Sequence, residues 1–236
     1  TIDGTELVAS MQVVVYDPEA EEVANYGKYG ILQSDNSVKI VNTAFVSGDL
    51  QIHFLELGNK YTGDSIYIKA GQTDVLIDAG SRQNSGQVIS SYVKNYCTDG
   101  VLEYVIATHA DQDHIAGFVG TSGGGVFDNF KCQNIISFAR TNKDTAIYKK
   151  FVEKRTAQKN DGANVYTALE CYNNQNGAKR VYDLSENVKM EVLYNYYYDH
   201  DSSDENNYSV CVMLHQYADD YDFQNPLSEQ NEGKVN

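Results

Sequence analysis

The chain places four potential metal ligands within six residues. His109, Asp111, Asp113 and His114 all occur in the string THADQDHIAG, directly after a run of apolar residues. Imidazole nitrogen and carboxylate oxygen are ligands that zinc takes in proteins, and clustered ligands can reach two metal centres. Two carboxylates this close together repel each other unless a cation lies between them. The string therefore predicts a site for one or two zinc ions, with manganese as the alternative.

A polar surface loop can also carry histidine and aspartate by chance. Here two of the five histidines, two aspartates, a preceding apolar run and a closing Gly117 agree with one another. Loops that follow strands are common places for binding residues. We therefore interpret the string as a metal-binding loop rather than a solvated acidic turn.

A series of strands and one helix must position this loop. Strands are predicted at residues 50–57, 65–70 and 74–77, which glycine-containing turns join into an antiparallel meander. Apolar residues at helical spacing predict a helix over 85–96, and a continuous apolar run predicts a strand over 101–107. The loop should therefore follow the last of four strands.

Mixed elements continue after the loop. A strand is expected at 135–139 and a helix at 144–159, followed by strands at 165–169, 180–184, 188–194 and 208–217. Helices among mostly sequential strands indicate a layered α/β or α+β sandwich.

The first 48 residues differ in texture from the rest. Strand-like runs at 11–16 and 37–46 are separated by an acidic stretch and predict a small β segment or the tail of a preceding domain. We expect the boundary at Ser47-Gly48-Asp49, so that residues 49–236 form the main domain, which carries the ligand string.

The loop resembles the signature His-x-His-x-Asp-His of the metallo-β-lactamase superfamily, with Asp111 in place of the second histidine. Asp78-Ala79-Gly80 is similar to the Asp-x-Gly that precedes this signature in the family. The string looks most like the hydrolase domain of ComEC-type competence proteins, whose loop reads His-x-Asp-x-Asp-His-Ile-Gly-Gly, although Ala116 replaces a glycine. The segments LQIHFLELGNKYTGDSIYIKAGQTDVLIDAG and ENNYSVCVML are also similar to that family in texture.

The resemblance implies a metallo-β-lactamase-like αββα sandwich and a division of roles among the loop residues. His109 and Asp111 would bind the first metal, and Asp113 and His114 the second. Asp113 would also orient or deprotonate the attacking water, which titrates near neutrality when bound to such a metal. Asp78 would fix the loop by hydrogen bonds from outside the ligand shell.

Of the three further ligands that the family normally supplies, one near the ENNYS segment, a bridging Asp and a final His, the last two cannot be assigned. After Asp222-Phe223, where a Thr-Gly-Asp turn is expected, the chain reads Gln-Asn-Pro-Leu, and no final histidine turn follows. Either the chain is a shortened or divergent member, or segments are missing between its parts. We favour a C-terminus that is incomplete or shortened. His200 could serve as a replacement ligand, although a solvated acidic loop is the preferred interpretation of its surroundings.

The remaining candidates have ordinary structural interpretations. We expect His53 and His215 to be sheet histidines, and the tyrosines at 194–198 to form a half-buried sheet face rather than a stacking platform for sugars or bases. Gly123-Gly124-Gly125 lacks the residues of a phosphate-binding loop and predicts a flexible loop. The four cysteines show no paired spacing, and Cys211 is expected to be a core thiol.

The amino-acid composition limits the classes of function that the chain can have. The chain has 18 Lys and Arg against 33 Asp and Glu, a formal net charge of −15, which disfavours long nucleic acid without excluding it. No apolar run approaches the roughly 20 residues that span a bilayer. We expect a metal-dependent phosphodiesterase acting on a small or phosphodiester substrate. The alternative is a degenerate, non-catalytic metal-binding or interaction module. Composition also suits an extracellular or cell-surface bacterial protein over a cytoplasmic one.

Overall fold

The computed structural model describes residues 28–32, 38–42, 50–57, 63–218, 220–231 and 233–235. The chain divides into two compact units, Thr1–Phe45 and Val46–Asn236. In the first unit, β1 (Lys28–Leu32) pairs with β2 (Val38–Asn42) in an antiparallel hairpin. The strand predicted at 11–16 and the boundary predicted at 47–49 lie outside the described residues.

A six-stranded sheet forms the centre of the second unit. Its order is β3-β4-β5-β6-β7-β8, with bounds Leu50–Phe54, Ile66–Ala70, Thr73–Ile77, Val101–Ala107, Lys131–Ser137 and Asn164–Thr167. The first three strands are antiparallel, as the meander predicts, and β5 to β8 run parallel. The carboxyl ends of β5, β6 and β7 therefore meet at one edge of the sheet.

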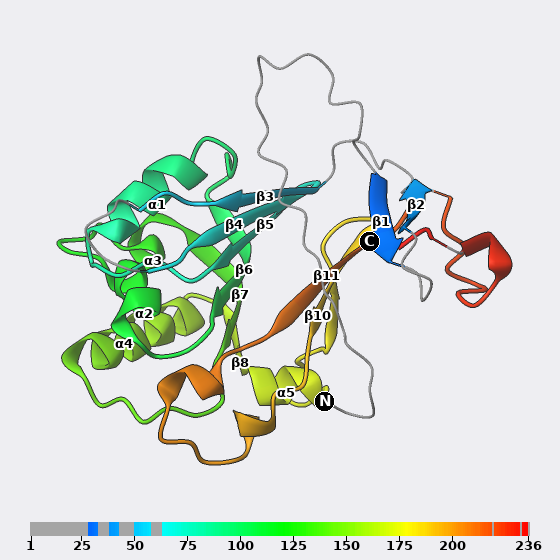
Figure 1. The fold of residues 1–236 in the computed structure, drawn as a ribbon. Helices are drawn as coiled ribbons and strands as arrows, with labels where there is room; N and C mark the ends of the chain where they lie inside the picture. The colour runs from blue at the N-terminus through cyan, green and yellow to red at the C-terminus, as the bar shows by residue number, and fades with distance from the viewer. Residues whose placement is uncertain are drawn as a thin grey trace. The chain divides into compact units, whose positions relative to one another are not determined.

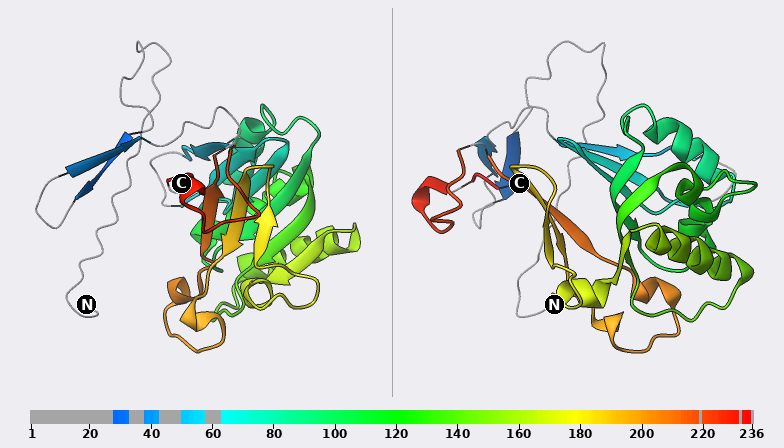
Figure 2. Two further views of the ribbon diagram at one scale, coloured as in Figure 1. Left: turned by 90° about the vertical axis from the view of Figure 1, so that its right-hand side faces the viewer. Right: turned by 180° about the vertical axis from the view of Figure 1, so that it is seen from behind.

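Helices cover one face of this sheet and a smaller sheet lies on the other side (Figure 1). The helices are α1 (Ser85–Val93), α2 (Gln112–Val119), α3 (Val126–Asn129) and α4 (Ala146–Asn160). The smaller antiparallel sheet has the order β11-β10-β9, with bounds Val212–Gln216, Val188–Val192 and Val181–Asp183. Figure 2 shows the same separation of helices, large sheet and small sheet from two other sides.

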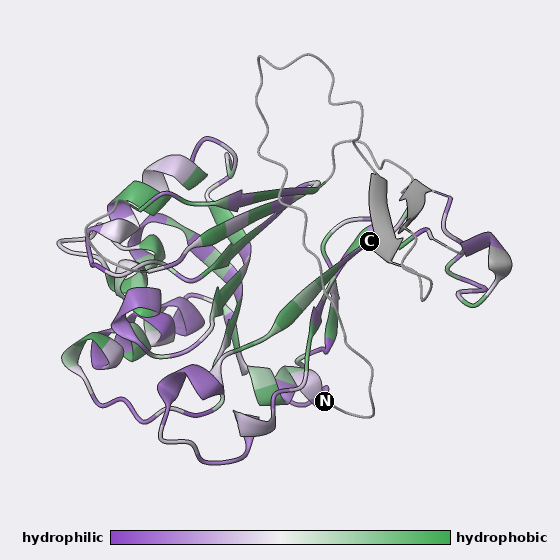
Figure 3. Ribbon diagram, viewed as in Figure 1, coloured by the Kyte–Doolittle hydropathy of each residue, from purple (hydrophilic) through white to green (hydrophobic). Residues whose placement is uncertain are grey.

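The core fills the spaces between these layers. Strand residues such as Leu76, Val105 and Ile135 are fully buried, and Val188 and Met190 of the small sheet belong to the same apolar cluster. Figure 3 shows the apolar colouring concentrated on the strands of the two sheets. The α/β fold predicted from the sequence is confirmed. No helix in the part of the chain that the structure describes is long and apolar enough to cross a bilayer.

Several local expectations were wrong. The strand predicted at 165–169 ends at Thr167, because Thr167 and Glu170 form a capping box that begins α5 (Ala168–Tyr172). The tyrosine run contains the 3-10 helix η1 (Tyr196–Tyr198) rather than a strand. Cys211 is exposed just before β11, whereas the other three cysteines are buried and all four are free thiols.

Candidate metal centre

The predicted ligands lie where parallel strands end. Asp78 follows β5, and Thr108 and His109 follow β6, whose residues pair in register with those of β5. The loop after β7 reaches the same place, since Lys143 forms an ion pair with Asp111. The sheet therefore brings these residues together from three separate parts of the chain.

Asp78 is the central hydrogen-bond acceptor of this region. Its buried carboxylate accepts from the Thr108 N–H at 2.8 Å and the Thr108 hydroxyl at 2.6 Å, and contacts His114 Nδ1 at 2.7 Å. Its backbone has a φ of +58°, a conformation that aspartate tolerates better than most residues. These bonds hold the Asp78 carboxylate against the start of the ligand string.

The two histidines present their Nε2 atoms in the same region. Their ring centroids are 4.0 Å apart. Nδ1 of His114 is occupied by Asp78, while Nδ1 of His109 lies 3.0 Å from the Thr108 hydroxyl and 3.3 Å from that of Ser209. An Nδ1 held by a polar partner is the arrangement that orients a metal-binding histidine, because it leaves Nε2 free as the ligand.

His109 Nε2 is buried and has no hydrogen-bond partner. An imidazole nitrogen in this state is costly unless something binds it. Its nearest carboxylate is Asp111, with Nε2 and Oδ2 separated by 3.6 Å, and His114 Nε2 lies 3.8 Å from Asp113 Oδ2. Two His-Asp pairs with an unsatisfied buried nitrogen fit a divalent cation of the zinc type.

The ligands form two pairs rather than one tight cluster. Within the described ranges, no three of their donor atoms lie within 4.8 Å of one another. Asp111 is the N-cap residue of α2, yet its side chain makes no capping bond and instead meets Lys143 Nζ at 2.5 Å. This ammonium group occupies one carboxylate oxygen that the resemblance assigns to the first metal.

The surroundings shift the pKa values of the two histidines in opposite directions. Burial, followed by the nearby His114, lowers the pKa of His109. Burial also acts to lower the pKa of His114, but the hydrogen bond and charge of Asp78 outweigh it, so this pKa is raised. The hydrogen bond to Asp111 raises the pKa of Lys143, which keeps its ammonium charged. His109 is therefore the more readily neutral ligand.

A buried carboxylate positions Lys143. Glu205, in the 3-10 helix η2 (Glu205–Tyr208), accepts from the Thr141 hydroxyl at 2.5 Å and from the Asn142 N–H at 2.8 Å. The Lys143 N–H in turn donates to the Thr141 hydroxyl at 2.9 Å. These bonds tie the loop after β7 to the segment before β11.

His200 lies in different surroundings. Its Nδ1 is 2.6 Å from an Asp199 carboxylate oxygen and 2.9 Å from the Tyr196 carbonyl, and its ring stacks on Tyr196. In the described residues, no hydrogen bond or ion pair connects it to the ligand string. The other two histidines are sheet residues, His53 against Tyr92 and His215 against Glu191.

Sequence reasoning missed the residues that support the site from other elements. Ser209 belongs to the ENNYS segment that the resemblance drew attention to, and Thr108 opens the ligand string, so both had a sequence signal. Glu205 begins the same ENNYS segment, so it also had a signal, whereas Lys143 had none, because it reaches Asp111 from the loop after another strand.

A second group of potential ligands has a structural explanation. Asp74, Cys97 and Asp99 offer donor atoms within 4.8 Å of one another. The buried Asp74 carboxylate already receives the Lys69 ammonium at 2.9 Å and the Tyr67 hydroxyl. Burial raises the pKa of Cys97 to about 12, so its thiol stays protonated. These groups satisfy one another without a cation.

One comparison with known proteins agrees with the resemblance of the ligand string over part of the chain. Residues 58–154 match the family model of the metallo-beta-lactamase superfamily. Two solved structures, a metallo-beta-lactamase from Pontibacter korlensis and one from Hirschia baltica, are similar at 12% identity, with TM-scores of 0.34 and 0.29. The similarity covers 65% and 64% of this chain but only 60% and 59% of those chains. No curated protein matches the sequence.

Proposed function

We propose that this chain, in which residues 58–154 match the metallo-beta-lactamase superfamily, is a metal-dependent hydrolase that cleaves phosphodiesters. The observation that carries the proposal is the buried, unpartnered Nε2 of His109 beside a second histidine whose Nδ1 is held by Asp78. Such a pair is organised to bind a cation. The choice of a phosphodiester as substrate rests on two observations. The loop resembles that of ComEC-type hydrolases, and a cation, Lys143, lies at the site.

The chain's own residues have distinct roles in this proposal. His109 and Asp111 would hold one zinc or manganese ion, and Asp113 and His114 a second. A bound ion of this kind polarises the phosphoryl group and lowers the pKa of water. Asp113, whose side chain is 41% exposed, would act as the general base. It would accept a proton from the attacking water while the oxygen of that water bonds to phosphorus. The ester bond to the leaving alcohol breaks, and that alcohol takes a proton from solvent.

The test uses the metal-loaded chain with bis-nitrophenyl phosphate, nitrophenyl phosphorylcholine and single-stranded DNA. We expect turnover of at least one substrate, and Asp113→Asn should reduce kcat by at least about a hundredfold with a smaller effect on KM, because general base catalysis contributes about that much. Asp144→Asn is the matched control, since Asp144 is exposed and pairs with Lys149. If none of the three substrates is turned over, the proposed phosphodiesterase activity is contradicted.

A non-catalytic metal-binding module is the second candidate. The ion pair between Lys143 and Asp111 favours it, because an ammonium on Asp111 leaves Asp113 and His114 as the one His-Asp pair of the ligand string free for a cation. Metal content separates the two functions. A protein that loses its metal in His109→Ala and His114→Ala, yet turns over none of the substrates, is the module. Retention of metal in both variants removes the ligand string from either role.

A further inference from the structure

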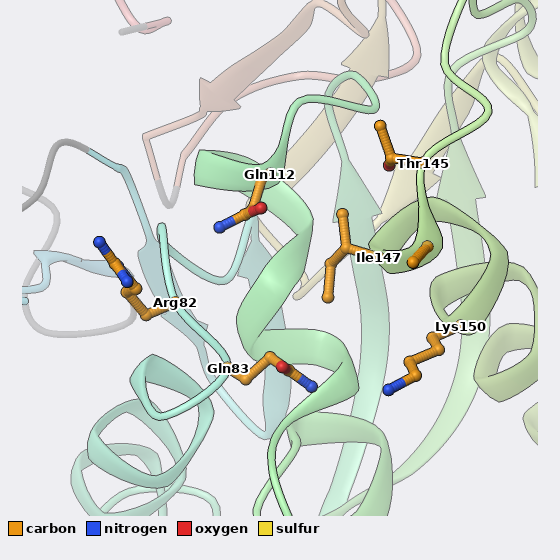
Figure 4. Close-up of a pocket in the computed structure, with 7 residues that line it drawn as sticks. Arg82, Gln83, Gln112, Thr145, Ile147 and Lys150 are labelled. Carbon is orange, nitrogen blue, oxygen red and sulfur yellow. The ribbon is translucent and has the colours of Figure 1, made fainter.

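A polar hollow adjoins the ligand string. It has a volume of about 340 Å³ and lies between the turn before α1, the start of α2 and the start of α4. Figure 4 shows its side chains, which include Arg82, Gln83, Gln112, Thr145, Ile147 and Lys150. Gln112 lies between the predicted ligands Asp111 and Asp113 in the sequence, so the hollow contacts the same stretch of chain as the candidate metal centre.

The charge of this hollow is opposite to that of the chain. Its lining contains two cations, Arg82 and Lys150, and no carboxylate, although the chain carries 33 acidic residues against 18 basic ones. Charges farther away than about 8–10 Å are largely screened at physiological salt. An anion inside the hollow therefore meets local cations more strongly than it meets the net charge of the molecule.

Lys150 is the cation available to a ligand. Among the described residues it has neither an ion-pair nor a hydrogen-bond partner, whereas its neighbours Lys149 and Lys154 pair with Asp144 and Asp128. Figure 4 shows the Lys150 ammonium and the Gln83 side chain pointing toward each other across the end of α2. Both residues also line a second hollow of about 340 Å³ along residues 119–123, so the polar surface continues past Lys150.

We propose that this hollow binds a second phosphate group of the substrate, so that the enzyme prefers phosphodiesters carrying a further phosphate over those with a single one. The inference rests on the proposed function. One phosphate would lie at the metal centre beside Lys143, and the second would lie against Lys150, in the hollow that Arg82 and Gln112 also line. Cations and amide donors are suitable partners for phosphate oxygens.

Equilibrium binding to the metal-loaded protein tests this inference without requiring turnover. Titration calorimetry compares thymidine 3′,5′-bisphosphate with thymidine 5′-monophosphate, and fructose 1,6-bisphosphate with fructose 6-phosphate. We expect the second phosphate to tighten binding about fivefold, which is about 1 kcal/mol, the upper range for an exposed ion pair. Because both members of a pair carry a phosphate that can reach the metal, their difference reports the second site alone.

Two variants locate the effect. Lys150→Ala should remove the advantage of the bisphosphate while leaving monophosphate binding unchanged, and Lys149→Ala, next to it on α4 but paired with Asp144, should keep the advantage. An advantage in the thymidine pair alone still supports the inference and adds a contribution from the nucleoside. Equal affinities within both pairs, or an advantage that survives Lys150→Ala, overturn it. If the protein turns over no substrate but still binds the bisphosphate more tightly in a way that depends on Lys150, only the proposed catalysis is contradicted.

Discussion

Asp78 shows how one residue can hold two ligands at once. Its carboxylate receives Thr108 through both backbone and hydroxyl, and it contacts Nδ1 of His114. Thr108 in turn lies beside Nδ1 of His109. Both imidazoles are thereby oriented through a single buried carboxylate, and supports of this kind commonly change metal affinity by 10–100-fold in metalloproteins.

The first prediction at the scale of single residues concerns Lys143. Its ammonium occupies Asp111 Oδ1, so a cation that binds Asp111 must displace it. We expect Lys143→Met to raise metal affinity up to about fivefold, which corresponds to about 1 kcal/mol, the upper range for an exposed ion pair. Competition with a chromogenic chelator measures it. Lys143→Arg keeps the charge and should bind metal like the wild type.

Unchanged affinity in Lys143→Met would show that Asp111 does not bind the metal. Reduced affinity would show instead that Lys143 supports the site. In either case far-ultraviolet circular dichroism of the variant, compared with Lys143→Arg, establishes whether the fold is kept.

The ligand string could be predicted from the sequence because its residues are neighbours in the chain. The residue types and spacing of the string alone predict a cation site at His109, Asp111, Asp113 and His114. The partner of Asp111 could not be predicted, because Lys143 approaches it only after the parallel strands β6 and β7 are aligned. Ser209 had a signal in the ENNYS segment, but its contact with His109 joins positions 100 residues apart and is seen only in the folded chain.

At the scale of elements, α2 was missed although its pattern was visible. Ile115, Phe118 and Val119 are buried and follow one helical face, but attention to the ligands led us to interpret this segment as a loop. The strands were easier to predict, since continuous apolar runs such as 101–107 have few alternatives. The 3-10 helix at Tyr196–Tyr198 shows why alternating tyrosines alone do not establish a strand.

Gly117 gives a prediction about how α2 is held. A Cβ at this position would lie 1.9 Å from the Ala79 carbonyl oxygen, and the Ala79 N–H donates to the His114 carbonyl at 2.8 Å. Gly117→Ala must therefore push α2 away from the end of β5. We expect a loss of about 1–3 kcal/mol in the free energy of unfolding, as in overpacked cores, together with weaker metal binding.

Urea unfolding and chelator titration measure the two effects of Gly117→Ala. Gly123→Ala is the control, because its Cβ would meet no atom within 4 Å and only its φ of +81° is unfavourable. That conformation costs about 1–2 kcal/mol for a residue with a Cβ, and metal binding should be unchanged. Normal metal binding in Gly117→Ala would contradict the close packing of α2 against β5.

Glu170 provides a prediction for pH. Burial acts to raise its pKa, but hydrogen bonds from Thr167 and Asn176 outweigh this, so the pKa is lowered in the folded protein. A lowered pKa stabilises the fold above the ordinary value of the carboxyl and loses that contribution as pH falls through the folded value. We expect Glu170→Gln to cost about 1 kcal/mol at pH 7, as capping residues do, and progressively less below about pH 4.

The measurement is urea unfolding of wild type and variant from pH 7 to pH 3.5. Glu153→Gln, exposed on α4, should give a difference near zero at every pH. A Glu170→Gln difference that stays constant with pH would show that the ionised carboxylate is not what caps α5.

At the scale of the whole molecule, the net charge is negative, whereas the side chains near the ligand string include cations. A net charge of −15 keeps other polyanions at a distance, and the cations near the ligand string act over a short range. The composition therefore predicts little about the substrate, whereas Lys143 and Lys150 bear on it directly. We also propose an extracellular or cell-surface location, which the low content of Lys and Arg supports.

The last prediction concerns the division of the chain. Among the residues that the structure describes, those of the candidate metal centre and of the apolar core cluster lie after residue 49, within the unit Val46–Asn236. A fragment of residues 46–236 should therefore fold alone, with a Tm within about 2–4 °C of the full chain, since a change of 1 kcal/mol shifts Tm by about that much in a domain of this size. It should bind the same amount of metal, as measured by elemental analysis. The full chain carrying His109→Ala and His114→Ala is the control for adventitious metal. A fragment that is unfolded by circular dichroism, or folded but without metal, would show that the first 45 residues complete the fold or the site.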